Sequence, residues 1–481
     1  MAAAVNDRSA AIEALAQNWP MLEALMAGTA AMRDAGERHM PKFTLEHPDD
    51  HRARVSVATL FPAFRRTVSV MVGKPFSSPV TYGEDVPAKV REWCDDVDLS
   101  GVNLDTFAAG LFTEALAYGL AGILVDAPPR PATAGPVVTR GDERAAGIRP
   151  YMVRVQHDQI IGYRTETRGG RIVLTQLRLR EDAVEADGEY GEKEVARVRV
   201  LTPGAWQVFR RVSTATNTAE WVLDDEGVSG LDVIPFVPVY GQRAGFMRGI
   251  SPLLDLAFLN VKHWQSQSDQ DDSVMYARKR LLALVGGDKS EPIVASANAI
   301  IYLPIGGDVK VAQGSAESVR VGQEALTALE DQMIQAGAEL LVKKPGDRSA
   351  TEAANDADAN KSDLQRLAEG FEDSLDQALY LMAQYAGLPT GGHVTLFKDF
   401  GADSLGEASG QLVLAMQQSG LISKGRAIAE MKRRGYLAAE VDAEEEAEQV
   451  EAEGPGLGGI GEGDDAEDAD EPADDEDAAA A

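Results

Sequence analysis

The residue types that most often bind metals are present in this sequence, but their spacing matches no established metal site. The histidines contain no HExxH pair, and His47 with His51 is better explained as surface polar residues at a junction between a loop and a helix. Asp356, Asp358 and Asn360 match the start of a calcium loop, but its glycine and final glutamate positions hold Lys361 and Leu367. We therefore expect no metal and no metal cofactor.

Motifs for nucleophilic catalysis and nucleotide binding are also incomplete. The sequence contains no G-x-S-x-G, and residues 420–425 have the glycine spacing of a phosphate loop with Arg426 in place of the lysine. Residues 456–461 match the dinucleotide pattern G-x-G-x-x-G, but no strand pattern precedes them and no helix pattern follows. We expect no catalysis and no cofactor. A hydrolase or a nucleotide-binding enzyme is the alternative.

Length and composition indicate a folded protein of several domains. A chain of 481 residues, 44% of them hydrophobic, is too long for a single core and is expected to form two to four domains. The lone Cys94 excludes an internal disulfide and favours a reducing compartment. We expect no signal peptide and no membrane span, because the best candidate, residues 110–125, contains Glu114 and is shorter than the roughly 20 residues that a bilayer requires.

The net charge of −31 is unevenly distributed. Residues 440–481 hold 19 acidic residues and no Lys, Arg or His, and the rest of the chain holds 58 acidic against 46 basic residues, a net charge of −12. We expect the acidic tail to be disordered. Ordinary nucleic-acid binders carry the opposite sign, so any contact with DNA is non-adhesive or confined to a local basic segment.

Hydrophobic periodicity predicts an α+β, mostly helical protein. Helices are expected over 8–33, 49–72 and 103–118, then a buried strand at 123–125 and a β-rich sector of about five strands over 151–240. Two long helices, 251–276 and 321–342, extend roughly 39 and 33 Å. They enclose short strands at 281–285, 299–303 and 309–312. A capping box at Ser349–Glu352 begins a helix over 350–386, and helices at 404–419 and 423–434 follow.

The two long helices predict contacts beyond a monomer. The second carries one narrow apolar seam, formed by Leu326, Leu329, Met333, Ala336 and Leu340. The first is polar throughout 265–273, so we expect this part to be solvated, to span a gap or to pack against copies of itself. The short strands between the helices do not form a stable domain alone, which again favours neighbouring copies.

The order of these parts resembles the portal proteins of tailed bacteriophages. The resemblance covers about residues 20–439 and rests on several stretches in order rather than on one motif. They are Arg66–Val68 with Val72–Phe76, the segment GLAGILVD at 119–126, Pro252–Ala257 with Asn260 and Gln265–Asp269, Leu303–Asp308, and Ala350–Ala353. A head completion adaptor, another ring of the virion, is a further alternative, and its usual small size argues against it.

The resemblance implies the portal fold and a division into its named regions. These are a wing over 1–250, stem helices over 251–278 and 320–342, a clip over 279–319, a tunnel loop over 343–349, a long bent helix over 350–388, a crown over 389–439 and the acidic tail over 440–481. It also implies three groups of site residues. They are the tunnel loop (Lys343, Lys344, Asp347, Arg348), the channel lining of the stem (Asp269, Asp271, Asp272, Glu330, Asp331, Glu339) and the clip contacts (Arg278, Lys279, Arg280, Asp288, Lys289).

The resemblance further implies the function and the partners. A ring, usually of twelve subunits, would occupy one capsid vertex of the virion and conduct double-stranded DNA during packaging and ejection, after assembly in the host cytoplasm. The implied partners are further copies of the chain, the terminase large subunit, head completion or adaptor proteins, and the major capsid and scaffolding proteins. An acidic channel would repel the DNA backbone, because adhesion to phosphates depends on Lys and Arg. Residues 343–348 would be a local exception, although a solvated turn that neutralises the end of the preceding helix is the simpler explanation.

Overall fold

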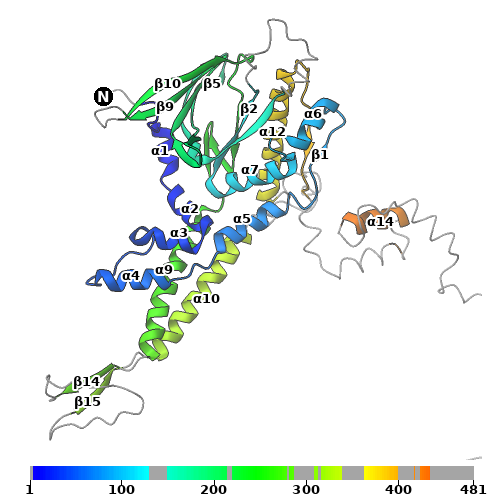
Figure 1. Cartoon of the computed structure of the whole chain (residues 1–481). Helices are drawn as coiled ribbons and strands as arrows, with labels where there is room; N and C mark the ends of the chain where they lie inside the picture. The colour runs from blue at the N-terminus through cyan, green and yellow to red at the C-terminus, as the bar shows by residue number, and fades with distance from the viewer. Residues whose placement is uncertain are drawn as a thin grey trace, which may run out of the picture. The chain divides into compact units, whose positions relative to one another are not determined.

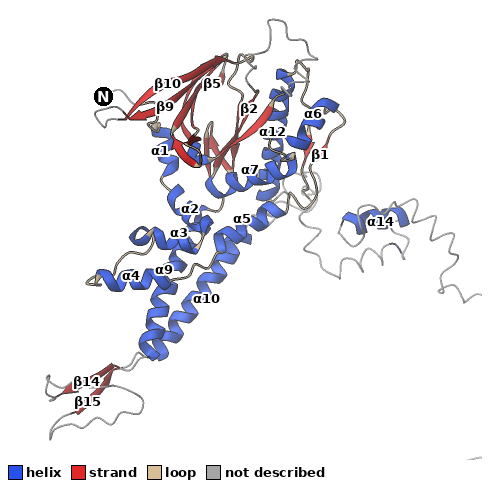
Figure 2. Ribbon diagram, viewed as in Figure 1, coloured by secondary structure: helices blue, strands red, loops and turns tan. Residues whose placement is uncertain are grey.

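The computed structural model describes residues 4–128, 149–213, 219–278, 281–285, 308–312, 316–338, 362–398, 417 and 423–433. The chain divides into two compact units, Met1–Lys398 and Asp399–Ala481, which are described separately. The first unit combines helices with antiparallel sheets (Figures 1 and 2). The α+β class predicted from the sequence is therefore confirmed.

The two helices predicted at the N-terminus are each divided. Pro20 lies in the first turn of α2, where its missing N–H removes no helical hydrogen bond, and Gly28 adopts a φ of 95° between α2 and α3. The chain leaves the next helix at Ala58, and Pro62 precedes α5. The elements are α1 (Ala10–Ala16), α2 (Trp19–Ala27), α3 (Thr29–Asp34), η1 (Gly36–Arg38), α4 (Pro48–Val57) and α5 (Ala63–Gly73).

A three-stranded sheet in the order β11-β2-β3 lies beside two helices. The side chain of Asn103 accepts a hydrogen bond from the Thr106 N–H at 2.9 Å and begins α7, as hydroxyl and amide caps do. Helices α7 and α12 both pack against this sheet, and the rings of Phe112 and Phe371 join them with centroids 5.1 Å apart. The predicted buried strand at 123–125 is confirmed as part of β2. The bounds are α7 (Leu104–Tyr118), β2 (Leu120–Asp126), β3 (Tyr151–Val155), β11 (Phe236–Tyr240) and α12 (Asp363–Tyr385).

The five strands predicted over 151–240 correspond to β4, β5, β8, β9 and β10, which form one antiparallel sheet in the order β10-β9-β8-β5-β4, but the same range also contains β3, β6, β7 and β11. One of its faces buries Ile161, Val198 and Val200. The sequence did not predict the hairpin of β6 and β7, whose side chains are mostly exposed and give no apolar pattern. The bounds are η3 (His157–Gln159), β4 (Ile160–Arg168), β5 (Arg171–Arg180), β6 (Ala183–Asp187), β7 (Gly191–Val195), β8 (Arg197–Thr202), β9 (Ala205–Ser213), β10 (Ala219–Val228), β12 (Gln242–Gly245) and β13 (Arg248–Ile250).

Two long helices follow, α9 (Leu254–Arg278) and α10 (Ala316–Ala338). Helix α9 begins three residues later than predicted, and the carbonyl of Ser251 accepts the N–H of Leu254 at 3.2 Å. Helix α10 begins at Ala316, within the range predicted as clip. In the chain between them, the predicted strands at 281–285 and 309–312 are confirmed as β14 (Leu281–Val285) and β15 (Asp308–Ala312), which pair antiparallel. The predicted strand at 299–303 lies outside the described residues.

The helix predicted over 350–386 does not run through Ser362, which has an extended backbone with φ −71° and ψ 158°. The Ser362 side chain accepts from the Gln365 N–H at 3.2 Å, and the Gln365 side chain accepts from the Ser362 N–H at 2.8 Å. This capping box begins α12 at Asp363. The box predicted at 349–352 and the acidic tail lie outside the described residues. The other elements are β1 (Thr81–Tyr82), α6 (Ala88–Trp93), η2 (Cys94–Asp96), β16 (Val394–Thr395) and, in the second unit, α14 (Lys424–Arg433), which confirms the predicted helix over 423–434.

Candidate functional site: the two-helix stem

We call α9 and α10 the stem, because they pack along one another for most of their length. The predicted seam of α10 is confirmed at Leu326, Leu329 and Met333, which are buried. The Gln270 amide of α9 donates to the carbonyl of Val319 at 2.7 Å. A Cβ at Gly322 would lie 2.0 Å from the Oε1 of Gln270, so a side chain at residue 322 would require the Gln270 amide to move.

The polar stretch of α9 finds many of its partners within the chain, which corrects the prediction that it needs solvent or other copies. Ser268 and Gln270 are buried. The Gln265 amide donates to the carbonyl of His39 at 3.0 Å, and the Arg54 guanidinium lies 3.5 Å from the Ser268 hydroxyl oxygen. The sequence did not predict this because the contacts come from segments more than 200 residues away.

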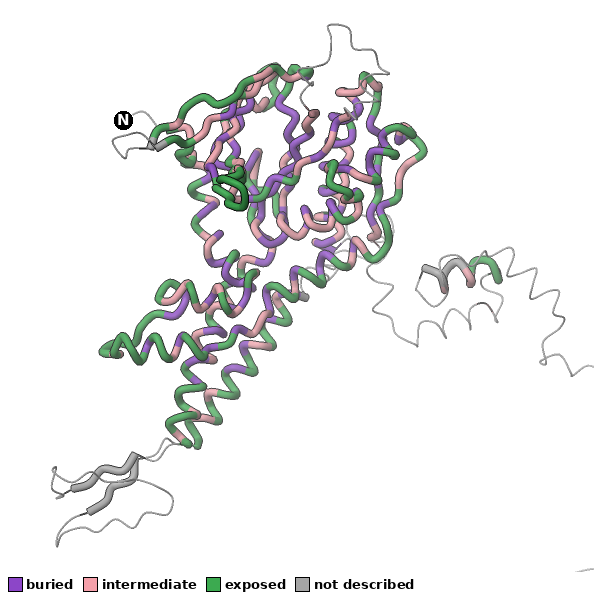
Figure 3. Tube along the Cα trace, viewed as in Figure 1, coloured by how far each residue is buried: buried purple, intermediate pink, exposed green. Residues whose placement is uncertain are grey.

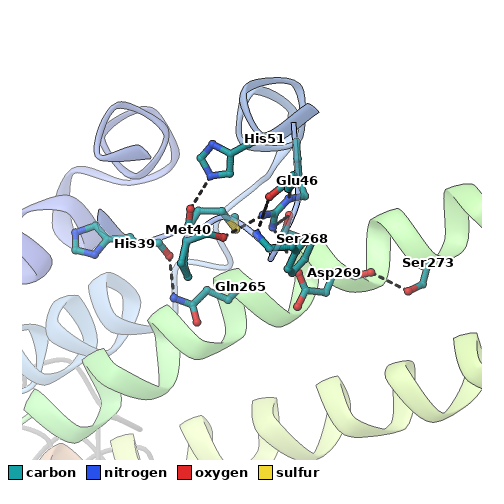
Figure 4. A network of polar contacts seen from close by, with 11 residues as sticks. His39, Met40, Glu46, His51, Gln265, Ser268, Asp269 and Ser273 are labelled. Atoms are coloured by element: carbon teal, nitrogen blue, oxygen red, sulfur yellow. Dashed lines mark hydrogen bonds and ion pairs between the residues drawn. The ribbon is translucent and has the colours of Figure 1, made fainter. Parts of the chain in front are cut away.

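Arg54 of α4 is the centre of a polar network that joins the loop before α4 to α9 (Figure 4). Its Nε lies 2.9 Å from Oε1 of Glu46 and its Nη2 lies 3.0 Å from Oε2 of the same carboxylate. Its Nη1 lies 3.5 Å from Oδ1 of Asp269 on α9. Nearby, the Nε2 of His51 donates to the carbonyl of Met40 at 2.7 Å. The two-point ion pair with Glu46 thus joins α4 to the loop before it, and the contact with Asp269 joins α4 to the stem.

The two carboxylates around Arg54 have opposite pKa shifts. The hydrogen bonds from Arg54 hold the pKa of Glu46 below its usual value. Burial raises the pKa of Asp269, the nearby charges of Asp272 and Glu46 raise it further, and Arg54 opposes them. The hydrogen bonds from Arg54 therefore favour the charged form of Glu46, whereas burial disfavours the charged form of Asp269.

Two of the residues predicted to line a channel pair with side chains of the same chain. Asp271, Asp272 and Asp331 are exposed, and the amide of Gln267 donates to Asp271 at 2.8 Å. Asp269 is also exposed but lies 3.5 Å from Arg54, and Oε1 of the half-buried Glu330 lies 3.2 Å from Nε2 of the buried His263. Asp269 and Glu330 thus hold the elements of one chain together, a role that periodicity did not indicate.

The other predicted site residues lie outside the described residues, apart from Arg278. This exposed residue ends α9. The residues outside are Glu339 of the predicted lining, Lys343, Lys344, Asp347 and Arg348 of the predicted tunnel loop, and Lys279, Arg280, Asp288 and Lys289 of the predicted clip.

Large apolar side chains remain exposed along the stem, although its two helices already share a seam. Figure 3 shows exposed positions along both helices. Phe258, Met275 and Tyr276 of α9 and Val321 and Ile334 of α10 are exposed. A contiguous apolar patch is typical of a surface that binds another protein, and of these five residues Met275 and Tyr276 are adjacent in the sequence.

Two classes of site were searched for in the described part of the chain. No group of three or more His, Cys, Asp or Glu residues in these ranges is arranged to hold a metal ion. None of the helices within the same ranges has the length and apolar character needed to cross a membrane.

Comparison with known proteins gives one partial family match and several structural likenesses. Residues 252–386 match a family model described as a domain of unknown function (DUF4055), a range that contains the stem and α12. No curated protein matches the chain. A chain of the virion of a native gene transfer agent (GTA) particle aligns at 14% identity with a TM-score of 0.40, covering 85% of this chain and 99% of that one. Chains from the necks of the native and the empty GTA particle align at 14% identity with TM-scores of 0.39, covering 83% of this chain and 97% of theirs. Alignments at this identity and TM-score do not establish a shared function.

Proposed function

We propose that the chain is a portal-type structural subunit and that copies of it close into a ring at one capsid vertex, through which double-stranded DNA passes during packaging and ejection. The observation that carries this proposal is the stem. Its two long helices leave apolar side chains exposed along their length, and the chain between them contains a two-stranded hairpin that is too small to be stable alone. Both features are accounted for when several copies pack side by side.

The charge of the stem also fits a passage for DNA. Exposed carboxylates at Asp271, Asp272 and Asp331 would face a phosphate backbone with like charge, which disfavours adhesion. The Arg320 guanidinium pairs with both Glu317 and Glu324 on α10, so this cation is already neutralised. A conduit requires no catalysis, and we propose that the protein has none.

The proposed docking functions follow from the resemblance to portal proteins. The segment 279–319 would contact the terminase large subunit and later the head completion proteins, and the wing would contact the major capsid and scaffolding proteins. Residues 343–349 would contact the DNA. The copy number would be twelve, the usual number for such rings.

The experiment that tests the proposal is electron microscopy of the purified chain, combined with light scattering. A closed ring with a central hole and a mass of many subunits is expected. A monomer at micromolar concentration that forms no ring on concentration or on addition of scaffolding protein would refute it. Hydrolysis of a nucleotide by the purified chain would favour the enzyme alternative instead.

A further inference from the structure

The tight turn at residues 43–46, which we call the Leu45 knob, presents a leucine fully to solvent. The Glu46 N–H donates to the carbonyl of Phe43 at 3.1 Å, and the Phe43 N–H donates to the Glu46 carboxylate at 2.9 Å. Leu45 lies between them with 99% of its surface exposed and a φ of 72°. This left-handed conformation is disfavoured for leucine and is adopted readily only by Gly, Asn and Asp.

The Leu45 knob is held in place by the Arg54 network. The Arg54 guanidinium lies 4.1 Å from the centre of the Phe43 ring and donates to the carbonyl of Pro41 at 3.2 Å. The same guanidinium makes the two-point pair with Glu46 and contacts Asp269 on the stem. The side chains of Arg54 and Glu46 are each only 9% exposed. The turn places Glu46 against Arg54, but the side chain of Leu45 buries almost no surface within the chain and is free to contact another molecule.

The position of the Leu45 knob indicates which surface it contacts. Gln265, Ser268 and Asp269 face α4 and its loop, whereas His263 and Gln270 face α10. Because successive residues of a helix are rotated by about 100°, these two sets lie on opposite sides of α9. Figure 4 shows the same order, with α9 between α4 and the yellow-green α10.

In a closed ring of more than two equivalent copies, each copy meets its neighbours through two different faces. The α4 side and the α10 side of the stem are one such pair of different faces, and α10 exposes Val321 and Ile334. We infer that Leu45 packs against α10 of a neighbouring copy of this chain and acts as an apolar contact between subunits. This inference rests on the proposed function, since it requires the ring.

The first test measures assembly of a variant that separates the apolar side chain of Leu45 from its left-handed backbone conformation. Leu45→Asn removes the apolar side chain but tolerates the left-handed backbone. The unassembled variant is therefore expected to melt at the same temperature as the unchanged chain, or higher. The dissociation constant of the contact between subunits is expected to rise roughly tenfold to a hundredfold, because the contact loses a buried leucine side chain. A purely structural role of Leu45 would leave assembly unchanged.

The second test identifies the contact with a short bismaleimide on the double variant Leu45→Cys, Val321→Cys. The native Cys94 is buried and burial raises the pKa of its thiol to about 11, so it reacts slowly. A contact between copies gives a ladder of covalent multimers, whereas either single variant gives dimers at most. Tyr190→Cys, with Val321→Cys, is the control, because Tyr190 is exposed at the turn of the β6–β7 hairpin.

The outcomes separate the inference from the proposed function. Rings that form equally well with Leu45→Asn, or that give no ladder with the double variant, would overturn the inference and leave the ring intact. A cross-link from residue 45 to another virion protein, in place of a second copy of the chain, would also overturn it. An unchanged chain that forms no ring would overturn the proposed function and the inference together.

Discussion

The side chain of Asn260 on α9 caps α5 from a distance of 196 residues along the sequence. Its Oδ1 accepts a hydrogen bond from the Phe64 N–H at 3.0 Å, and its Nδ2 donates to the carbonyl of Phe61 at 2.8 Å. The residue that precedes α5 is Pro62, whose side chain has no oxygen to accept this hydrogen bond. The fully buried Asn260 therefore satisfies the start of α5 and fixes it to the stem.

Replacing Asn260 with alanine is expected to destabilise the fold by roughly 2 kcal/mol, because two buried backbone groups lose their partners. Urea unfolding followed by tryptophan fluorescence measures the change. Lys262→Ala is the control, since Lys262 is exposed on the same helix. Equal stability of the two variants would contradict the capping role.

Arg54→Met is expected to lower the free energy of unfolding by roughly 3 kcal/mol, because it leaves the carboxylate of Glu46 buried without its partner. The double variant Arg54→Met, Glu46→Met is expected to recover part of this loss, since no uncompensated charge remains. Arg52→Met is the matched control. The Arg52 guanidinium pairs with Asp49 at the surface. The free energy of unfolding is therefore expected to fall by less than about 1 kcal/mol in this variant. A loss equal to that of the control would show that the Arg54 pair is solvated.

The features that the sequence predicted well are those that depend on neighbouring residues. The seam at Leu326, Leu329 and Met333 and the helix over 103–118 follow from helical spacing, and both are confirmed. The capping box of α12 was also readable from Ser362 and Gln365. The box at Ser349–Glu352 lies earlier in the sequence and predicts a longer helix.

The features that the sequence did not predict depend on contacts between distant segments. Nothing local distinguishes Arg54 from Arg52, although the first is a buried partner of the stem and the second is exposed. The polar residues of α9 seemed to require other copies, because their partners at His39 and Arg54 cannot be found by periodicity. The resemblance to portal proteins includes Gln265–Asp269, but it does not indicate what these residues contact.

The pair of Asp85 and His393 predicts a pH dependence of local stability near β1 and β16. Hydrogen bonding to Asp85 raises the pKa of His393 above its ordinary 6.5, and hydrogen bonding to His393 lowers the pKa of Asp85 below its ordinary 3.8. The contribution of His393 is fully present below pH 6.5 and is lost as the pH rises through its raised pKa. The contribution of Asp85 is present above pH 3.8 and is lost as the pH falls through its lowered pKa.

The difference in stability between the unchanged chain and His393→Ala is therefore expected to be largest between the two ordinary pKa values and to fall on either side. Unfolding curves across this range measure it, and an NMR titration of His393 gives its pKa directly. The pair is exposed, so the difference also decreases as salt is added. A difference that grows above pH 8 would contradict the assignment of the ion pair.

The last prediction concerns the basic segment at 343–348, for which the two interpretations from the sequence expect different outcomes. As a contact for DNA, Lys343, Lys344 and Arg348 would each form a weak, salt-screened interaction with a phosphate, repeated in every copy of the ring. Neutralising all three with glutamine is then expected to leave the melting temperature and the assembly of rings unchanged and to lower the DNA content of assembled particles.

If residues 343–348 are instead a solvated turn that neutralises a helix end, the triple variant is expected to give a different result. The triple variant would then lose on the order of 1 kcal/mol of stability, and particles would fill normally. Arg426→Gln is the control for a general loss of positive charge, because Arg426 is exposed on α14, outside the stem. Particle DNA measured beside the melting temperature of the rings separates the two cases, since normal filling with a lowered melting temperature would leave residues 343–348 without a DNA contact.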